Sequence, residues 1–459
     1  MNPLEAVKKE LSEHFHDESR RIIFRSKVEN LEKGEKCNSF FFKNIHSAHT
    51  PLVQLRNREG ILCDTKEDIR KAVTDVYGDL YSEKRSDGDQ AEKFFSGIPR
   101  KVSTPAREVL NAPLTLEELH LAVKSFKSGK TPGSDGLPIE FYTSLWDLLG
   151  PDLLELYEEM EQERVMPHTL REGMIALLYK HKGKRCDLKN WRPISLLNVD
   201  YKILAKTMVN RLKGVMGEMV HPDQTCGVPG RRVADSLALI RDTIQYITDR
   251  NIRAALVCLD QEKAFDRVSH EFIERVLPGF GLGERFCNYV KIMYTDIFSS
   301  VMVNGWKTDP FPIRSGGRQG CPLSPSLFVL VIEILAEYIR KNPNIRGIPT
   351  PGDAKKEVKC TLYMDDVTLF CTDGKSVQSL LEACKDFGKA SGAKINVDKS
   401  QAKLFGSCDL CKEPLPFPIE ARLVKILGIW FADQVQQRKA GTNDSQAETG
   451  LLELETPEH

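Results

Sequence analysis

Two adjacent carboxylates, Asp365 and Asp366, lie between stretches in which apolar and polar residues alternate. The alternation over 358–362 and 367–371 predicts two short strands joined by a tight turn at residues 363–366. Neighbouring carboxylates at the tip of an apolar hairpin repel each other, and a divalent cation between them relieves the repulsion. An Asp-Asp pair is also a common turn dipeptide, which is the simpler interpretation of the pair alone. The apolar frame and a third carboxylate upstream favour a metal site.

The third carboxylate is Asp260, which follows the apolar run A-A-L-V-C-L at residues 254–259. This run has no helical period and predicts a strand that is buried on both faces. A carboxylate at the exit of such a strand points into whatever cleft lies there. Together with the Asp-Asp pair it would supply the hard oxygen ligands that two Mg²⁺ ions need for phosphoryl or nucleotidyl transfer.

Three further segments could bind phosphates or a nucleotide. The basic loop 180–185 joins predicted strands at 174–179 and 191–197, and its charge would attract a phosphate backbone, although an exposed charged tip is usually only solvated. The loop 128–136 contains G-K-T, but a phosphate-binding P-loop needs glycine at position 124, where the chain has lysine. The glycine-rich segment 314–325 could bring its backbone close to a substrate.

Helical patterns predict the elements that position these segments. Thr115 and Glu118 form a capping box, which predicts a helix running towards residue 127. Apolar residues at helical spacing predict packing helices, and serines are expected to cap two of them. The remaining predicted helices cover residues 4–15, 201–219, 327–339 (capped by Ser324) and 377–387, one that begins near Ala234 and one capped by Ser269.

Composition limits the class of protein. With 459 residues, the chain exceeds what one core usually holds, so two or more lobes are expected. Lys plus Arg equals Asp plus Glu at 65 each, so any nucleic-acid surface must be a local patch. The 12 cysteines form no even framework, which is typical of reduced cysteines in an intracellular protein, and Cys408 and Cys411 lack partners at zinc-ligand spacing. No apolar run approaches the ~20 residues that cross a bilayer, so no membrane partner is expected.

The motifs resemble those of one family, the reverse transcriptases of LINE-type (non-LTR) retrotransposons. The sequence L-D-Q-E-K-A-F-D-R-V at 259–268, followed by Y-M-D-D at 363–366, resembles the first and third catalytic motifs of that family. The match continues in order over roughly residues 35–431. Its other segments are the loop 128–136, W-R-P-I-S-L at 191–196, 221–231, R-Q-G-C-P-L-S-P at 318–325, 391–400 and the strand pair around 425–429.

The resemblance implies an α/β (α+β) fold, namely the right-hand polymerase fold with fingers and a palm whose antiparallel sheet bears the three aspartates. It implies an amino-terminal helical extension and linker at 1–100, which helps to hold RNA, and fingers at 101–245. The palm with its primer-grip strands would span 246–431, and 432–459 would be a polar, disordered tail.

The resemblance also implies a role for particular side chains in RNA-directed DNA synthesis. Asp260, Asp365 and Asp366 would be the catalytic residues and would hold two Mg²⁺ ions, or Mn²⁺. Phe265 would exclude a 2′-hydroxyl by its bulk; without the motif it would be interpreted as a core phenylalanine. The nucleotide-binding residues would be Lys130, Arg192, Phe265, Gln319 and Gly320, and the template and primer contacts would be Lys180, Lys182, Lys184, Arg185, Tyr363, Met364 and Gly428.

Two departures from the family pattern keep a second hypothesis open. Met364 stands where LINE-type enzymes commonly carry alanine. After Phe431 the chain turns polar, where the family continues into a thumb, and no endonuclease precedes Met1. The sequence therefore predicts either a truncated polymerase that uses an RNA template, a DNA primer and dNTPs, with missing segments supplied by a longer element product, or an inactive remnant that binds RNA. The resemblance implies an intracellular protein of the nucleus and cytoplasm.

Overall fold

The computed structural model describes residues 54–83, 88–96, 98, 100–181, 183–406, 415–420 and 423–432. The helix expected at 4–15, Lys182, the pair Cys408 and Cys411, and the tail from 433 onward lie outside the described residues. The chain forms two compact units. The first unit contains Met1–Met219, Lys263–Val331 and Ala390–Gly392, and the second contains Val220–Glu262, Ile332–Lys389 and Ala393–His459.

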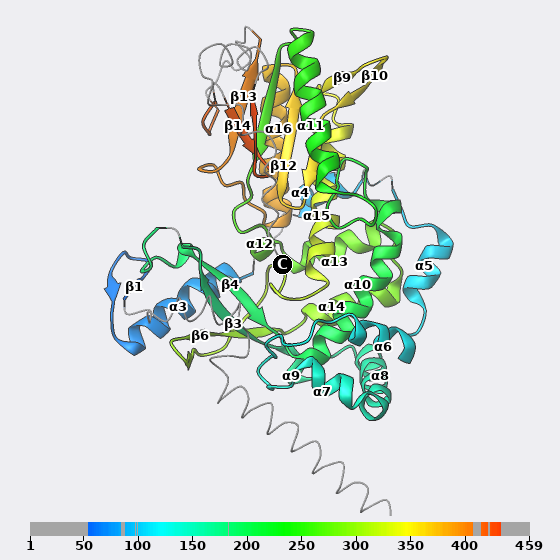
Figure 1. The fold of residues 1–459 in the computed structure, drawn as a ribbon, viewed down its shortest axis with the longest axis vertical. Helices are drawn as coiled ribbons and strands as arrows, with labels where there is room; N and C mark the ends of the chain where they lie inside the picture. Colours follow the sequence, from blue (N-terminus) through cyan, green and yellow to red (C-terminus); the bar gives the residue numbers. More distant parts are fainter. Residues whose placement is uncertain are drawn as a thin grey trace, which may run out of the picture. The chain divides into compact units, whose positions relative to one another are not determined.

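The second unit is built on a four-stranded antiparallel sheet. Its order is β11 (Cys360–Tyr363), β12 (Asp366–Cys371), β5 (Ala254–Leu259) and β13 (Gln401–Phe405). Figure 1 labels β12 and β13 in this sheet, and β5 lies between them. The predicted hairpin is confirmed, because β11 and β12 pair directly through Tyr363 and Asp366 and leave a two-residue turn.

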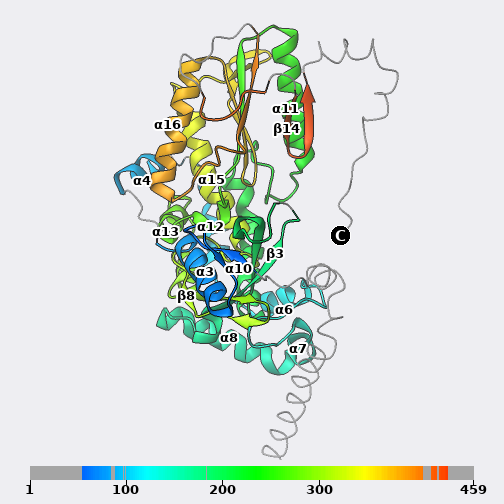
Figure 2. The ribbon, with the colours of Figure 1, turned by 90° about the vertical axis from the view of Figure 1, so that its left-hand side faces the viewer.

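Strand β5 lies in the middle of this sheet and is covered on both faces, as its apolar run predicted. Side chains that alternate along a strand point to opposite faces. On one face, Leu256 of β5 packs with Ile244 of α11 (Val233–Asp249) and with Val424 of β14 (Leu423–Ile426). On the other face, Leu259 lies beside Phe387 of α16 (Gly374–Ser391). Figure 2 shows the sheet between α16 on one side and α11 with β14 on the other.

The remaining strands of the second unit form two small hairpins. Strand β14 pairs with β15 (Ile429–Ala432), which confirms the strand pair predicted around 425–429. Strand β9 (Ile348–Thr350) pairs with β10 (Asp353–Val358).

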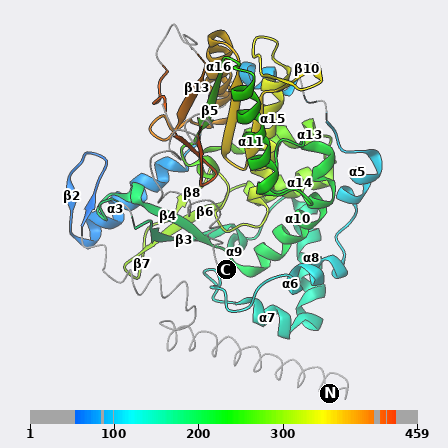
Figure 3. The same cartoon turned by 45° about the horizontal axis from the view of Figure 1, so that its top comes forward.

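The first unit contains a five-stranded mixed sheet. Strand β3 (Glu172–Tyr179) pairs antiparallel with β4 (Trp191–Leu196), which confirms the hairpin predicted around the basic loop. Strand β6 (Phe298–Val303) runs parallel to β3 and also pairs with β7 (Trp306–Lys307) and β8 (Phe311–Pro312). The hairpin of β1 (Leu55–Arg56) and β2 (Leu62–Cys63), with α3 (Lys66–Leu80), lies at the tip of β3 and β4 (Figure 3).

A helical layer packs beside this sheet within the first unit. The capping box is confirmed, because Thr115 accepts from the Glu118 backbone N–H at the start of α6 (Leu116–Lys124). Arg211, on α10 (Val199–Met219), donates to both Glu118 oxygens and thereby ties α10 to that start. The other helices are α4 (Gly88–Phe95), α5 (Thr104–Asn111), α7 (Ile139–Ser144), α8 (Trp146–Glu163), α9 (His168–Arg171), the 3₁₀ helix η1 (Leu188–Asn190), α12 (Ala264–Arg267), α13 (His270–Gly279) and α14 (Glu284–Tyr294).

The predicted packing helices are present with small shifts at their ends. Ser269 accepts a hydrogen bond from the Phe272 N–H and caps α13, as expected. Ser324, which was expected to cap the long apolar helix, is instead the first residue of α15 (Ser324–Lys341). Among the helices that the structure describes, none combines the length and the apolar character needed to cross a membrane.

Candidate functional site

The end of strands β5 and β12 brings the three aspartates together in the second unit. Val367 pairs with Leu259, so the next residues outward, Asp366 and Asp260, are neighbours across the antiparallel ladder. Opposite residues in such a ladder have Cα atoms about 4.5–5.5 Å apart and side chains on the same face. Asp365 occupies the two-residue turn beside them.

Burial and neighbouring negative charge both disfavour ionisation of the two hairpin carboxyl groups. Burial and the negative charges of Asp365 and Asp260 raise the pKa of Asp366 to about 6. Burial, followed by the charge of Asp260, also raises the pKa of Asp365. Each carboxylate therefore makes ionisation of its neighbour harder, which is the arrangement that a bound cation stabilises.

Asp260 is held by its backbone while one of its carboxylate oxygens stays without a hydrogen bond. Its N–H donates to the Ser400 hydroxyl at 3.1 Å, and its carbonyl accepts from the Asn396 N–H at 2.8 Å. Oδ2 is buried and accepts no hydrogen bond within the described part of the chain. The ammonium of Lys399 lies 3.7 Å from that oxygen, which is ion-pair distance.

These observations fit divalent cations held by Asp260, Asp365 and Asp366. A buried oxygen without a hydrogen bond and two carboxylates whose pKa values are raised, first by burial and then by neighbouring negative charge, form a hard, anionic donor set. Within the described ranges, no group of three or more His, Cys, Asp or Glu side chains is arranged so that it could by itself hold a metal ion. Mg²⁺ usually keeps several waters and takes only one or two carboxylates, so it does not require a closed protein cage.

The side chain of Gln224 accepts a hydrogen bond from the backbone of the turn that carries Asp365. Met364 has φ 60°, a left-handed conformation that costs energy for a non-glycine residue. The Gln224 side-chain oxygen accepts from the Met364 N–H at 3.4 Å and from the Cys226 N–H at 3.0 Å. Because Gln224 is fully buried, this support is fixed in place.

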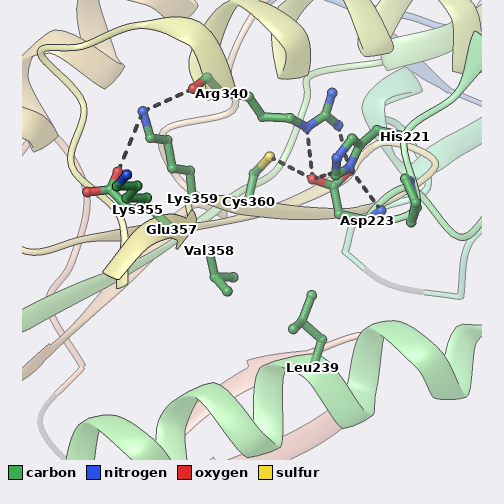
Figure 4. A pocket seen from close by; sticks show the side chains of 10 residues that line it. His221, Asp223, Leu239, Arg340, Lys355, Glu357, Val358, Lys359 and Cys360 are labelled. Atoms are coloured by element: carbon green, nitrogen blue, oxygen red, sulfur yellow. Dashed lines mark hydrogen bonds and ion pairs between the residues drawn. The ribbon is translucent and has the colours of Figure 1, made fainter. Parts of the chain in front are cut away.

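The residue before it, Asp223, anchors the same loop to strand β11. Its carbonyl accepts from the Leu362 N–H at 2.9 Å, and its carboxylate takes two hydrogen bonds from Arg340, at 2.5 and 2.8 Å. Although burial raises its pKa, the hydrogen bond from His221 and the charge of Arg340 hold the pKa of Asp223 below its usual value. Figure 4 shows His221 and Arg340 converging on Asp223 in a cavity of about 510 Å³. His221 and Arg340, the charged groups drawn beside Asp223, both pair with it. This cluster therefore holds the loop against the β11–β12 hairpin.

The first unit holds the predicted nucleotide-binding residues, and it brings Phe265 and Gln319 together. The Gly317 N–H donates to the Phe265 carbonyl at 2.6 Å, so the glycine-rich loop docks on helix α12. Phe265 is half-buried and its ring packs on Phe328 with centroids 4.6 Å apart. Gly320 has φ +115°, and a Cβ there would lie 2.4 Å from the Ser195 carbonyl oxygen, so only glycine fits.

Arg192 and Lys130 are both exposed. Of the two, only Arg192 lies on a strand that is hydrogen-bonded to the glycine-rich loop in the described structure. The Ser195 N–H, on the same strand β4 as Arg192, donates to the Gln319 carbonyl at 2.7 Å. Lys130 lies in the loop after α6, where the Gly129 N–H donates to Glu140 at 2.6 Å. Among the described residues, no hydrogen bond or ion pair joins Lys130 to Arg192, Phe265 or Gln319.

The predicted template contacts lie on two hairpins, one in each unit. In the first unit, Lys180, Lys184 and Arg185 are exposed at the tip between β3 and β4. The guanidinium of Arg185 lies 5.1 Å from the Tyr179 ring centre, and the Trp191 Nε1–H donates to the Arg185 carbonyl, so Arg185 contacts both strands of the hairpin. In the second unit, Tyr363 and Met364 are half-buried at the β11–β12 turn, and Gly428 forms the exposed β14–β15 turn with φ +83°.

The sequence did not identify Gln224 or Lys399 as parts of this site. Both lie in segments whose resemblance to family motifs was noted, 221–231 and 391–400, but no local pattern assigns them a contact. Their partners, Met364 and Asp260, are about 140 residues away along the chain. Only the folded sheet brings such residues together.

Comparisons with known sequences identify one matching family and several relatives. The family described as reverse transcriptase (RNA-dependent DNA polymerase) matches residues 179–431. The chain is 34% identical over 420 residues to the transposon TX1 uncharacterized 149 kDa protein of Xenopus laevis, which is 90% of this chain and 32% of that protein.

Two further relatives come from insects. The chain is 29% identical over 301 residues to the retrovirus-related Pol polyprotein from the type-1 retrotransposable element R2 of Popillia japonica, which covers 63% of the chain and 39% of the relative. It is 23% identical over 393 residues to the RNA-directed DNA polymerase from the mobile element jockey of Drosophila funebris, covering 81% and 40%. The chain thus spans between about a third and two fifths of the length of these relatives.

Repulsion among the three carboxylates predicts that Asp366→Asn stabilises the fold in metal-free buffer. Because the folded pKa of Asp366 is raised from 3.8 to about 6, its contribution to stability is complete below pH 4 and is lost as pH rises through about 6. The variant should therefore melt at a higher temperature than wild type at pH 7.5 and at the same temperature near pH 4. Although neighbouring atoms shield its carboxyl group, Asp366 as a whole residue is exposed to solvent, so we expect a gain on the order of 1 kcal/mol or less.

Thermal melts in the presence of a chelator at the two pH values would measure this effect. Asp249→Asn, an exposed aspartate at the end of α11 in the same unit, is the matched control and should leave the melting temperature unchanged. A lower melting temperature for Asp366→Asn at pH 7.5 would contradict the repulsion.

Proposed function

Because this chain belongs to the reverse transcriptases of non-LTR retrotransposons, we propose that it catalyses RNA-directed DNA synthesis. The reaction is the attack of a primer 3′-hydroxyl on the α-phosphate of a deoxynucleoside triphosphate, with pyrophosphate as leaving group. The observation that carries the proposal is the convergence of Asp260, Asp365 and Asp366 at one end of the sheet. The second hypothesis, an inactive remnant, is less favoured because all three aspartates of this acidic triad are present in the chain.

Asp260, Asp365 and Asp366 are the residues that would hold two Mg²⁺ ions. Bound there, such ions would activate the primer hydroxyl and stabilise the charge of the leaving pyrophosphate. The chain's own contribution is preorganisation. Strands β5 and β12 fix two of the carboxylates across a ladder, and Gln224 supports the turn that carries the third. The repulsion that remains without cations favours cation binding over further hydrogen bonds within the protein.

The resemblance assigns the residues of the first unit to the nucleotide. Phe265 would exclude a ribose 2′-hydroxyl, and Gln319 with Gly320 would contact the incoming nucleotide. Arg192 and Lys130 would bind its triphosphate. This role suits the exposed guanidinium of Arg192, because its forked donors match phosphate oxygens.

An RNA template and a DNA primer are the proposed macromolecular partners. Lys180, Lys184 and Arg185 are exposed at the tip of the basic hairpin, and their charges, with that of Lys182 from the sequence, would attract phosphates. Tyr363, Met364 and Gly428 would contact the template-primer duplex. The family resemblance favours a location in the nucleus and the cytoplasm.

Loss of one carboxylate charge should abolish synthesis without releasing the template. Asp365→Asn removes charge where the cations would bind and leaves the basic hairpin intact, so extension should stop while template affinity stays nearly unchanged. Primer extension on poly(rA)/oligo(dT) with Mg²⁺, alongside a filter-binding assay, measures both properties. The control Asp249→Asn should extend like wild type, and substantial extension by Asp365→Asn would overturn the assignment.

Phe265→Ala should weaken sugar discrimination. Removing the ring opens space for a 2′-hydroxyl, and we expect ribonucleotide incorporation relative to dNTP to rise on the order of tenfold. The control is Phe328→Leu, because Phe328 is the buried ring against which Phe265 packs and it offers no surface to the sugar. Unchanged discrimination in Phe265→Ala together with a lower melting temperature would show that Phe265 serves only as a core side chain.

A further inference from the structure

A cavity of the first unit borders the start of the glycine-rich segment 314–325. Its volume is about 330 Å³, within the size range of small-ligand pockets. Its lining comes from residue 83, the start of α13, the passage from α14 into β6, and residues 312–314 around β8. None of the residues assigned to the proposed reaction lines this cavity. Its chemistry therefore follows from its own lining.

His270, at the start of α13, presents a hydrogen-bond acceptor in this lining. Its Nε2 lies 2.9 Å from the Gly316 carbonyl oxygen, and because a carbonyl only accepts, Nε2 carries the proton. Neighbouring atoms enclose most of the imidazole, and this burial lowers the pKa of His270 to about 4. The ring is therefore neutral near neutral pH, so Nδ1 has a free lone pair. Among the described residues, Nδ1 takes part in no hydrogen bond.

The charges around the cavity are mainly negative. Three carboxylates line it, on Glu83, Glu271 and Asp296, together with one guanidinium, on Arg314. Arg314 Nη1 lies 3.7 Å from the Glu83 carboxylate, so these two charges offset each other. Within the described part of the chain, Glu271 and Asp296 make no hydrogen bond or ion pair. Exposed carboxylates are usually only solvated, but two beside an enclosed acceptor attract a cation that carries N–H donors.

The remaining walls favour a flat ligand with an apolar body. Tyr294 is buried, and its ring meets the His270 ring edge-on with centroids 4.9 Å apart. Phe298 and Ile313 add apolar surface. A cation near an aromatic face gains further attraction. Amidinium and guanidinium groups are flat and carry several N–H donors in a fork, so one such group can donate to a carboxylate and to an imidazole nitrogen together.

We propose that this cavity binds an amidinium or guanidinium group on an apolar body, which donates to His270 Nδ1 and faces the carboxylates of Glu271 and Asp296. The same chemistry is available on a free small molecule and on an arginine side chain of a partner protein. Because His270 also binds the Gly316 carbonyl, the occupant would hold the start of the glycine-rich segment in place. The inference rests on the cavity and not on the proposed polymerase activity.

Benzamidine is the probe, and isothermal titration calorimetry measures its binding. Benzamide has the same shape without the charge, so wild type should bind it on the order of tenfold more weakly than benzamidine. Asp296→Asn and Glu271→Gln should each weaken benzamidine binding on the order of threefold, because each removes one exposed carboxylate charge. Asn suits position 296, where φ is 51°, because its side chain tolerates the left-handed conformation.

Glu108→Gln is the matched control. Glu108 is exposed on α5 in the same unit and does not line the cavity, so this variant should bind benzamidine like wild type. Nitrogen-15 NMR of labelled histidine supplies a second readout. The Nδ1 resonance of His270 should shift when benzamidine is added, because Nδ1 then accepts a hydrogen bond.

N-acetylarginine amide distinguishes the two sources of the cation, because it carries the guanidinium on a peptide backbone. Binding of this compound as tightly as benzamidine would assign the cavity to an arginine of a partner protein, and binding of benzamidine alone would assign it to a free small molecule. No binding of benzamidine, equal affinity for benzamide, or an unshifted His270 Nδ1 resonance would overturn the inference. Neither readout requires DNA synthesis, so absence of primer extension would overturn only the proposed function.

Discussion

The mutual repulsion of three carboxylates at the end of one sheet is the constraint on which the second unit depends. Burial raises the pKa values of Asp365 and Asp366, and the negative charge of Asp260 raises both further. A fold that keeps such groups together must hold their backbones by other means. It does so with a central strand buried on both faces, because a strand that packs on α11 and on α16 cannot shift its register without exposing its apolar side chains.

The loop before α11 provides a second restraint on the same hairpin. Met364 adopts a left-handed conformation that an unsupported turn would avoid, and Gln224 accepts the hydrogen bond from its N–H. Asp223, paired with Arg340, holds that loop against β11. Breaking a buried charged pair by removing one partner costs about 3–5 kcal/mol, so this brace resists displacement of the hairpin. The strain and the repulsion are concentrated at the residues proposed for chemistry, and the restraints lie around them.

Local sequence patterns predicted the elements of this fold better than the contacts between them. The apolar run 254–259, the alternating hairpin and the capping box at Thr115 each contain their own signal, because the period or the cap lies within a few residues. Strand and helix positions could therefore be predicted. Contacts between distant residues, such as the hydrogen bond from Tyr81 to the Asp266 carboxylate, could not. Tyr81 is 185 residues from Asp266, and no short pattern connects the two. The hydrogen bonds from the Gln319 side-chain amide to Asp266 likewise could not be predicted from the sequence.

If Asp260, Asp365 and Asp366 share divalent cations, loss of one of these carboxylates must reduce the number of bound ions. Mn²⁺ titration followed by electron paramagnetic resonance can compare the wild-type chain with Asp260→Asn in the presence of primer-template and an unreactive dNTP analogue. We expect two tightly bound Mn²⁺ ions in wild type and the loss of at least one in Asp260→Asn. Without metal, the melting temperature of the variant should equal or exceed that of wild type. An identical number of bound ions in both chains would contradict it.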